Sequence, residues 1–254
     1  EIDRLIAKQQ QAYTHFSALA RVVREHLADD ITTSDGASLV IDPDQIHYMG
    51  ISNGATFGAV ITATSLEFTR AALVVGGGGL VHFLERAESW NALGPLLQNR
   101  FGTPLELQVV LSLLQLKLDP IDSLSYVAHL TENRFSGLPE LDASLHMAVN
   151  DSSVNNMLTE IVARSAGVPL MTPSAKDIWG LDPISASEEG VASKSALVVY
   201  DEMYPPSPIT NDAPAEDNGA HGSVRELDVY KVHIARFIED GALVQVCDGA
   251  CDPE

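Results

Sequence analysis

One short motif, Gly50-Ile51-Ser52-Asn53-Gly54, constrains the fold of this chain more than any other feature. A short apolar run, 46–51, leads into the motif, and a run of small residues that suits a helix, 53–65, follows at once. The pattern therefore predicts a tight turn from a strand into a helix. A side chain at Gly50 or Gly54 is expected to collide with the neighbouring strand and helix, and the serine between them to adopt an unfavourable backbone conformation.

A serine in such a turn is presented above the sheet. Ser52 Oγ would point away from the strand, and the Asn53 N–H would lie at a helix N-terminus, where it can stabilise an oxyanion. The pattern G-x-S-x-G between a strand and a helix is that of a nucleophile elbow. The less specific alternative is a glycine-rich turn with a surface serine.

Strands and helices are expected to alternate along the rest of the chain. Apolar runs predict strands at 46–51, 70–75, 141–150 and 195–200, helical spacing predicts helices at 1–28, 53–65, 154–166 and 224–239, and 172–195 and 204–222 are expected to be loops. This alternation predicts an α/β fold with a doubly wound, mostly parallel sheet. In such a sheet, functional groups collect at the carboxyl ends of the strands.

A long helical pattern, residues 80–130, interrupts the alternation, with Pro95, Pro104 and Pro120 as expected breaks. It predicts a helical cap inserted into a core formed by residues 1–79 and 131–254. The glycine run 76–79 before it lacks the Lys and Ser/Thr of a phosphate-binding loop, so it is expected to be a turn at the end of a strand.

Two later residues are placed to activate Ser52, because a serine hydroxyl needs an imidazole to take its proton and a carboxylate to orient that imidazole. Asp151 directly follows a predicted strand, and His221 lies in a predicted glycine-rich loop before the last helix. The order Ser, Asp, His is the one expected with a nucleophile elbow. Asp201 and Asp122 are alternative acids, and Asp151 could instead cap a helix.

The elbow at 50–54, Asp151 and His221 together resemble the α/β-hydrolase fold family over about residues 1–240. The resemblance implies a Ser-His-Asp hydrolase that cleaves carboxylic esters or related acyl compounds through an acyl-enzyme. Such a hydrolase needs no cofactor or metal, and residues 80–130 would form its lid. A peptidase or amidase of the same fold, or a non-catalytic ligand-binding protein on the same scaffold, are the alternatives.

The chain departs from that family before the elbow. Family members usually place several strands there, and one of their loops supplies the second oxyanion N–H. This chain has only a predicted helix and a polar segment, 29–44, before the elbow. We therefore expect N-terminal strands from a preceding segment or a second chain to complete the sheet.

The charge and the cysteine content indicate which partners this chain disfavours and in which compartment it is expected. The formal net charge is −20, from 15 basic and 35 acidic residues, which disfavours nucleic acids and anionic membranes as partners. The longest apolar segment, 105–118, is broken by polar residues and predicts an amphipathic helix, so no membrane span is expected. Cys247 and Cys251 are either free thiols or a small disulfide loop, and a disulfide would indicate an oxidising, secreted or periplasmic, location.

Overall fold

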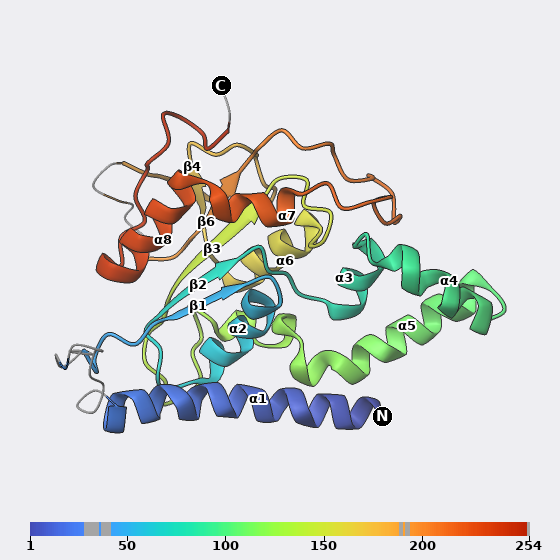
Figure 1. The fold of residues 1–254 in the computed structure, drawn as a ribbon, viewed down its shortest axis with the longest axis horizontal. Coiled ribbons are helices and arrows are strands. Elements are labelled where there is room, and N and C mark those ends of the chain that lie inside the picture. Colours follow the sequence, from blue (N-terminus) through green and yellow to red (C-terminus); the bar gives the residue numbers. More distant parts are fainter. Residues whose placement is uncertain (28–35, 37–41, 188–189, 191–193, 253–254) are drawn as a thin grey trace.

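The structure, a computed structural model, describes residues 1–27, 36, 42–187, 190 and 194–252. Its centre is a six-stranded sheet in the order β1-β2-β3-β6-β4-β5, in which all paired strands are parallel (Figure 1). Helices flank the sheet, so the general α/β class predicted from the sequence is confirmed.

The four central strands lie where the apolar runs predict them. They are β1 (Tyr48–Ile51), β2 (Arg70–Val74), β3 (Asp142–Ala148) and β6 (Ala196–Tyr200). The expectation of a continuous loop at 172–195 is wrong, because two short strands, β4 (Leu170–Thr172) and β5 (Pro183–Ser185), extend the sheet beyond β6. Three residues are too few to produce a readable alternation of apolar and polar side chains.

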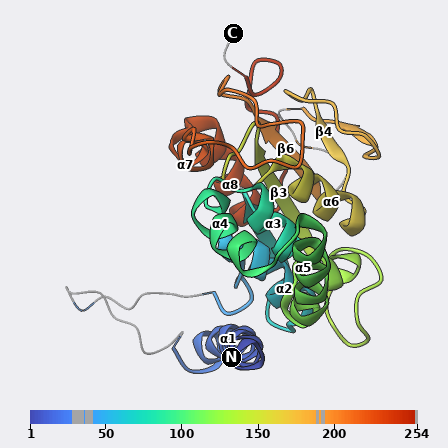
Figure 2. The same ribbon diagram turned by 90° about the vertical axis from the view of Figure 1, so that its right-hand side faces the viewer.

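Helices cover both faces of the sheet. Figure 2 shows α6 (Asn156–Ala166) and α8 (Asp228–Asp240) on opposite sides of it. The helix behind the elbow, α2 (Asn53–Thr64), packs with α6 into one apolar cluster around Leu73 and Leu145, whereas α8 packs into a second cluster around Val74 and Val198. Successive residues of β2 thus serve opposite faces, as strand geometry requires. Gly167, in the left-handed conformation, ends α6 as predicted.

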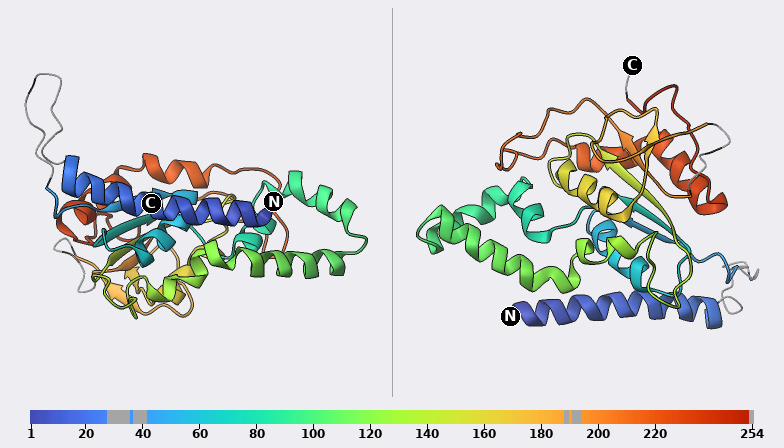
Figure 3. Two further views of the ribbon diagram at one scale, coloured as in Figure 1. Left: turned by 90° about the horizontal axis from the view of Figure 1, so that it is seen from below. Right: turned by 180° about the vertical axis from the view of Figure 1, so that it is seen from behind.

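The first helix, α1 (Ile2–Val22), continues as a π-helical turn (Val23–Leu27) and runs past α2 (Figure 3). Tyr13 anchors α1, because its hydroxyl donates a 2.7 Å hydrogen bond to the Ile121 carbonyl oxygen. Arg21 and Arg24 both form ion pairs with the buried Glu67 carboxylate. Among the described residues, no strand pairs with β1 on the side away from β2, so the expected N-terminal strands remain a prediction.

The described segment 80–130 contains helices and no strand. It comprises α3 (Leu80–Arg86), α4 (Trp90–Arg100), α5 (Pro104–Leu118) and three 3-10 turns (Asp119–Ile121, Ser123–Ser125 and Val127–His129). Pro95 lies inside α4, so the expected break there is wrong; Pro104 instead begins α5, after a capping box formed by Thr103 and Glu106. In Figures 1 and 3, α4 and α5 project away from the sheet.

Cys247 and Cys251 form a disulfide, with their Cα atoms 5.3 Å apart. The small loop adjoins the end of β6, where the Asp201 N–H donates to the Cys251 carbonyl oxygen at 2.9 Å. Disulfides are typical of oxidising compartments, so the pair fits an extracytoplasmic location. None of the described helices is both long and apolar enough to cross a membrane.

Candidate active site

Ser52 occupies the turn between β1 and α2. Its backbone has φ 56° and ψ −119°, which a residue with a side chain rarely adopts. The Ser52 N–H donates to the Val74 carbonyl oxygen at 2.9 Å, which fixes the turn to the adjacent strand. The local geometry is therefore the strained strand–turn–helix that the motif predicts.

The glycines around Ser52 differ in how much space surrounds each of them. A Cβ atom at Gly50 would lie 2.2 Å from the Gly54 carbonyl oxygen, and one at Gly58 would lie 2.3 Å from the Tyr48 ring. A Cβ atom at Gly54 would meet no atom within 4 Å, so the expected collision at Gly54 is wrong. The close approach of α2 to β1 instead requires Gly50 and Gly58.

Backbone strain collects at one edge of the sheet. Beyond the ends of β1, β2, β3 and β6, a residue other than glycine has a positive φ, namely Ser52 (56°), Val75 (44°), Asn150 (61°) and Met203 (61°). The value at Val75 is the most unusual, because β-branched residues rarely enter this region. Such strain persists only where the surroundings enforce it, and it is often found at functional sites.

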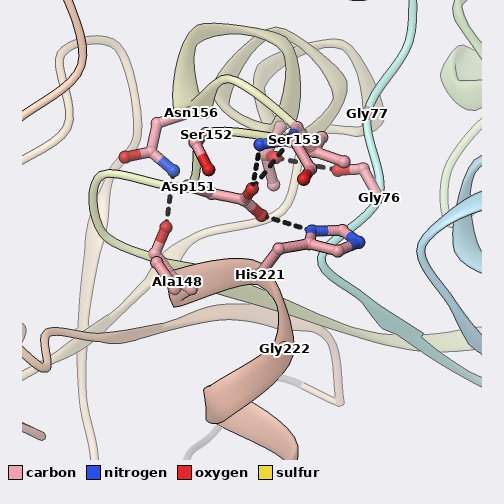
Figure 4. A network of polar contacts seen from close by, with 12 residues as sticks. Gly76, Gly77, Ala148, Asp151, Ser152, Ser153, Asn156, His221 and Gly222 are labelled. Atoms are coloured by element: carbon pink, nitrogen blue, oxygen red, sulfur yellow. Dashed lines mark hydrogen bonds and ion pairs between the residues drawn. The ribbon is translucent and has the colours of Figure 1, made fainter. Parts of the chain in front are cut away.

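Asp151 and His221 are in contact at this edge. Asp151 Oδ2 accepts a 2.7 Å hydrogen bond from His221 Nδ1, and Asp151 Oδ1 accepts hydrogen bonds from the Ser153 and Val154 N–H groups, both at 2.8 Å (Figure 4). The Asp151 side chain is 2% exposed and that of His221 is 18% exposed. The bond to Asp151 leaves Nε2 on the far side of the ring, where it accepts or donates no hydrogen bond within the described part of the chain.

His221 lies on a short helix, α7 (Ala220–Ser223), rather than in the flexible loop that its neighbouring glycines suggest. Gly219 precedes this helix with φ 91°, which lets the chain turn directly into it. The Asn218 side chain accepts a 3.1 Å hydrogen bond from the Ala220 N–H. The imidazole is thus carried by ordered backbone.

A second layer of polar contacts joins the loops that carry the pair. Ser152 Oγ donates to Asp217 Oδ1 at 2.9 Å, and the Asn218 N–H donates to Ser152 Oγ at 3.1 Å. Hydrogen bonds from the Gly219 N–H and from Ser152 lower the pKa of Asp217. These groups were not predicted from the sequence, although Asp-Asn-Gly before His221 is a composition typical of side-chain-stabilised turns.

The structure therefore brings together two of the three proposed catalytic side chains. Among the described residues, neither Ser52 Oγ nor the Asn53 N–H has a hydrogen-bond partner, so Ser52 and His221 are not hydrogen-bonded. Ser52 follows β1 and Asp151 follows β3, two strands away, which corresponds to a lateral separation of about 10 Å. An imidazole held on the Asp151 side is the group that could bridge such a gap.

Comparison of the chain with protein-family models, with curated proteins and with solved structures finds no match. The resemblance to α/β-hydrolases thus rests on the residues of this chain alone.

The alternative acids do not contact His221. Asp122 is fully buried and accepts hydrogen bonds from the Gly79 and Leu80 N–H groups, at 2.9 and 2.6 Å. It therefore holds the glycine run 76–79 where that run leaves β2 and enters α3. Asp201 accepts a hydrogen bond from the Met203 N–H at 2.8 Å. No group of three or more His, Cys, Asp or Glu side chains in the described part of the chain could hold a metal ion.

Proposed function

We propose that this chain is a serine hydrolase of the α/β-hydrolase type that cleaves a carboxylic ester or related acyl compound. Ser52 would be the nucleophile, His221 the general base and Asp151 the residue that orients the imidazole. The observation that carries the proposal is the 2.7 Å contact between His221 and the buried Asp151, at the sheet edge that also carries the strained Ser52.

The proposed reaction proceeds through an acyl-enzyme. Ser52 Oγ attacks the acyl carbon and its proton passes to His221 Nε2, while the Asn53 N–H stabilises the oxyanion. His221 then gives the proton to the leaving alcohol as the acyl–alcohol bond breaks. In the second half, water attacks the acyl-enzyme and His221 again acts as base. Because catalytic hydrogen bonds often tighten only when substrate binds, the missing Ser52–His221 bond would form in the complex.

The helical segment 80–130 is proposed to act as the lid over this site. Two contacts support that role. The Glu88 N–H donates to the Ser152 carbonyl oxygen at 3.0 Å, next to Asp151, and Asn91 Nδ2 donates to the Pro214 carbonyl oxygen at 2.7 Å, in the loop that leads to His221. Movement of this segment would be coupled to both loops, as in enzymes whose lids exclude water.

A non-catalytic ligand-binding protein on the same scaffold is the second candidate, because fold alone does not fix function. The absence of a hydrogen bond between Ser52 and His221 among the described residues favours it. A peptidase or amidase is a third possibility, since the same three side chains serve those reactions. A secreted or periplasmic site of action is proposed from the disulfide alone.

Labelling with a fluorophosphonate tests the proposal directly. The proposal predicts a covalent adduct on Ser52, located by peptide mass spectrometry, that is absent from Ser52→Ala and slowed in His221→Ala. Ser89→Ala, an exposed serine without a capping hydrogen bond, is the matched control and should label normally. A folded protein that takes no label at Ser52 would favour the binding protein. Esters and amides of graded acyl length would then separate esterase from amidase.

A further inference from the structure

A cavity of about 300 Å³ lies between the helical segment and the loop that follows β6. One wall comes from α3, α4 and α5, and the other from residues 211–213. Asn91 joins the two walls, because its Nδ2 donates to the carbonyl oxygens of Pro214 and Ala215, at 2.7 and 3.2 Å. The volume is at the lower end of the range for small-molecule sites.

A buried carboxylate lines this cavity. Glu85 is only 4% exposed, and its Oε1 accepts a 2.7 Å hydrogen bond from Gln108 Nε2. Its Oε2 is buried and accepts no hydrogen bond from the described residues. The exposed His82 places Nδ1 3.4 Å from this oxygen, and an imidazole is charged only when protonated. A buried carboxylate oxygen without a hydrogen bond is costly, so a ligand that brings a donor would stabilise the site once the Glu85 carboxyl group turns toward the cavity.

The same cavity has an aromatic and apolar part. Trp90 and Leu107 line it, and Gly94 leaves room for the indole, because a Cβ atom there would lie 2.7 Å from Trp90 Nε1. Among the described lining residues, Glu85 and Asp212 are acidic and none is basic. With a net charge of −20 on the chain, the electrostatic environment favours a cation.

We propose that this cavity binds a small organic cation that carries N–H donors, such as a primary ammonium group on an apolar body. The Glu85 carboxyl group turns to accept a hydrogen bond from the ammonium group, the Trp90 ring stabilises the positive charge, and Leu107 contacts the apolar body. A quaternary ammonium group supplies the positive charge but has no N–H group to donate to the Glu85 carboxylate. The proposal does not depend on Ser52 or on hydrolysis.

Calorimetry with three matched probes at pH 8 tests the proposal. Phenethylammonium carries charge and N–H donors, phenethyltrimethylammonium carries charge alone, and 2-phenylethanol carries neither. The first should bind most tightly and the alcohol least. Glu85→Gln keeps an acceptor for Gln108 and should weaken phenethylammonium binding by about tenfold or more. Glu226→Gln removes the same charge from an exposed side chain outside the cavity and should bind as the parent does.

Tryptophan fluorescence is a second measurement, which shows whether the ligand binds beside Trp90. Trp90 and Trp179 are the only tryptophans, so in a Trp179→Phe background a change in fluorescence on binding reports on Trp90. Circular dichroism checks that each variant is folded. The proposal is overturned by equal affinity for the alcohol and the amine, by unchanged amine affinity in folded Glu85→Gln, or by no amine binding at about 10 mM. Fluorophosphonate labelling of Ser52 is unaffected by any of these outcomes.

Discussion

The Tyr48 hydroxyl donates a 2.7 Å hydrogen bond to the Gly54 carbonyl oxygen, and so ties β1 to the first turn of α2 across the elbow. The Tyr48 ring also fills the space beside Gly58, which brings the helix close to the strand. The elbow is therefore held by one aromatic side chain as well as by its glycines. Tyr48 is itself buried, which raises its pKa to about 12 and keeps the hydroxyl protonated as a donor.

Gly50→Ala and Gly54→Ala should have opposite consequences. Gly50→Ala forces a Cβ atom into the Gly54 carbonyl and should destabilise the fold by at least about 2 kcal/mol, because backbone must move. Gly54→Ala meets open space in a helical turn and should change the free energy of unfolding by no more than about 1 kcal/mol, in the stabilising direction. Urea denaturation measures both. A severe loss in Gly54→Ala would contradict the geometry.

The elements with long or well-marked patterns could be predicted from the sequence. The elbow, the four central strands and α6 with its Gly167 cap follow from local pattern, because a glycine turn or an apolar run imposes the same geometry in most surroundings. The strands β4 and β5 could not be predicted, since three-residue strands owe their conformation to pairing rather than to their own sequence.

The contacts of the candidate site likewise fall into those that the sequence predicts and those that it does not. Chain order and loop position are enough to predict that Asp151 meets His221. The contacts that hold the two loops together, from Ser152 to Asp217 and from Asn218 to the Asn150 carbonyl oxygen, join residues more than 60 positions apart and have no sequence signal. The steric role assigned to Gly54 was wrong because the motif does not report which side of the turn is open.

Asp151→Asn should lower kcat about 10³- to 10⁴-fold if the proposed reaction is correct. An asparagine still accepts the Ser153 and Val154 N–H groups, but its amide can present N–H to His221 Nδ1 and favour the wrong tautomer. Ester hydrolysis measured at saturating substrate gives the change in kcat. Asp201→Asn, at the alternative acid, should remain within about twofold, and the reverse ranking would show that Asp201 is the functional acid.

Ser152 and Asp217 should act as a pair that positions His221. Asp217→Ala and Ser152→Ala each remove the 2.9 Å bond between the two loops and should each lower the free energy of unfolding by about 1 kcal/mol. The double variant should lose less than the sum, because both changes remove the same interaction. The effect on hydrolysis should appear in kcat, with KM nearly unchanged. Strict additivity in the unfolding measurements would show that the two side chains are not coupled.

A buried network of hydrogen-bonded side chains on β3, β6 and α8 should make the fold less stable in acid. His146 Nε2 bonds to Ser144 Oγ at 2.7 Å, and the Tyr200 hydroxyl bonds to Nδ1 of His146 at 2.9 Å and to Nδ1 of His233 at 2.7 Å. Burial, together with repulsion from His233, lowers the pKa of His146 to about 3. Burial lowers the pKa of His233 to about 4. Both imidazoles are therefore neutral in the folded protein near neutral pH.

The sign of the pH effect follows from these values. An unfolded histidine titrates near 6.5, so below that pH the unfolded chain binds protons that the folded chain does not. The stabilisation from keeping both groups neutral is fully present above about pH 6.5 and is lost as the pH falls toward 4, by a total on the order of a few kcal/mol.

Urea denaturation between about pH 6.5 and 5, where most carboxylates stay ionised, measures how steeply the free energy of unfolding changes with pH. His15→Gln, on an exposed turn of α1, should keep that slope, whereas His233→Gln should reduce it. A flat profile in the parent protein would mean that the buried pair does not titrate as its surroundings require.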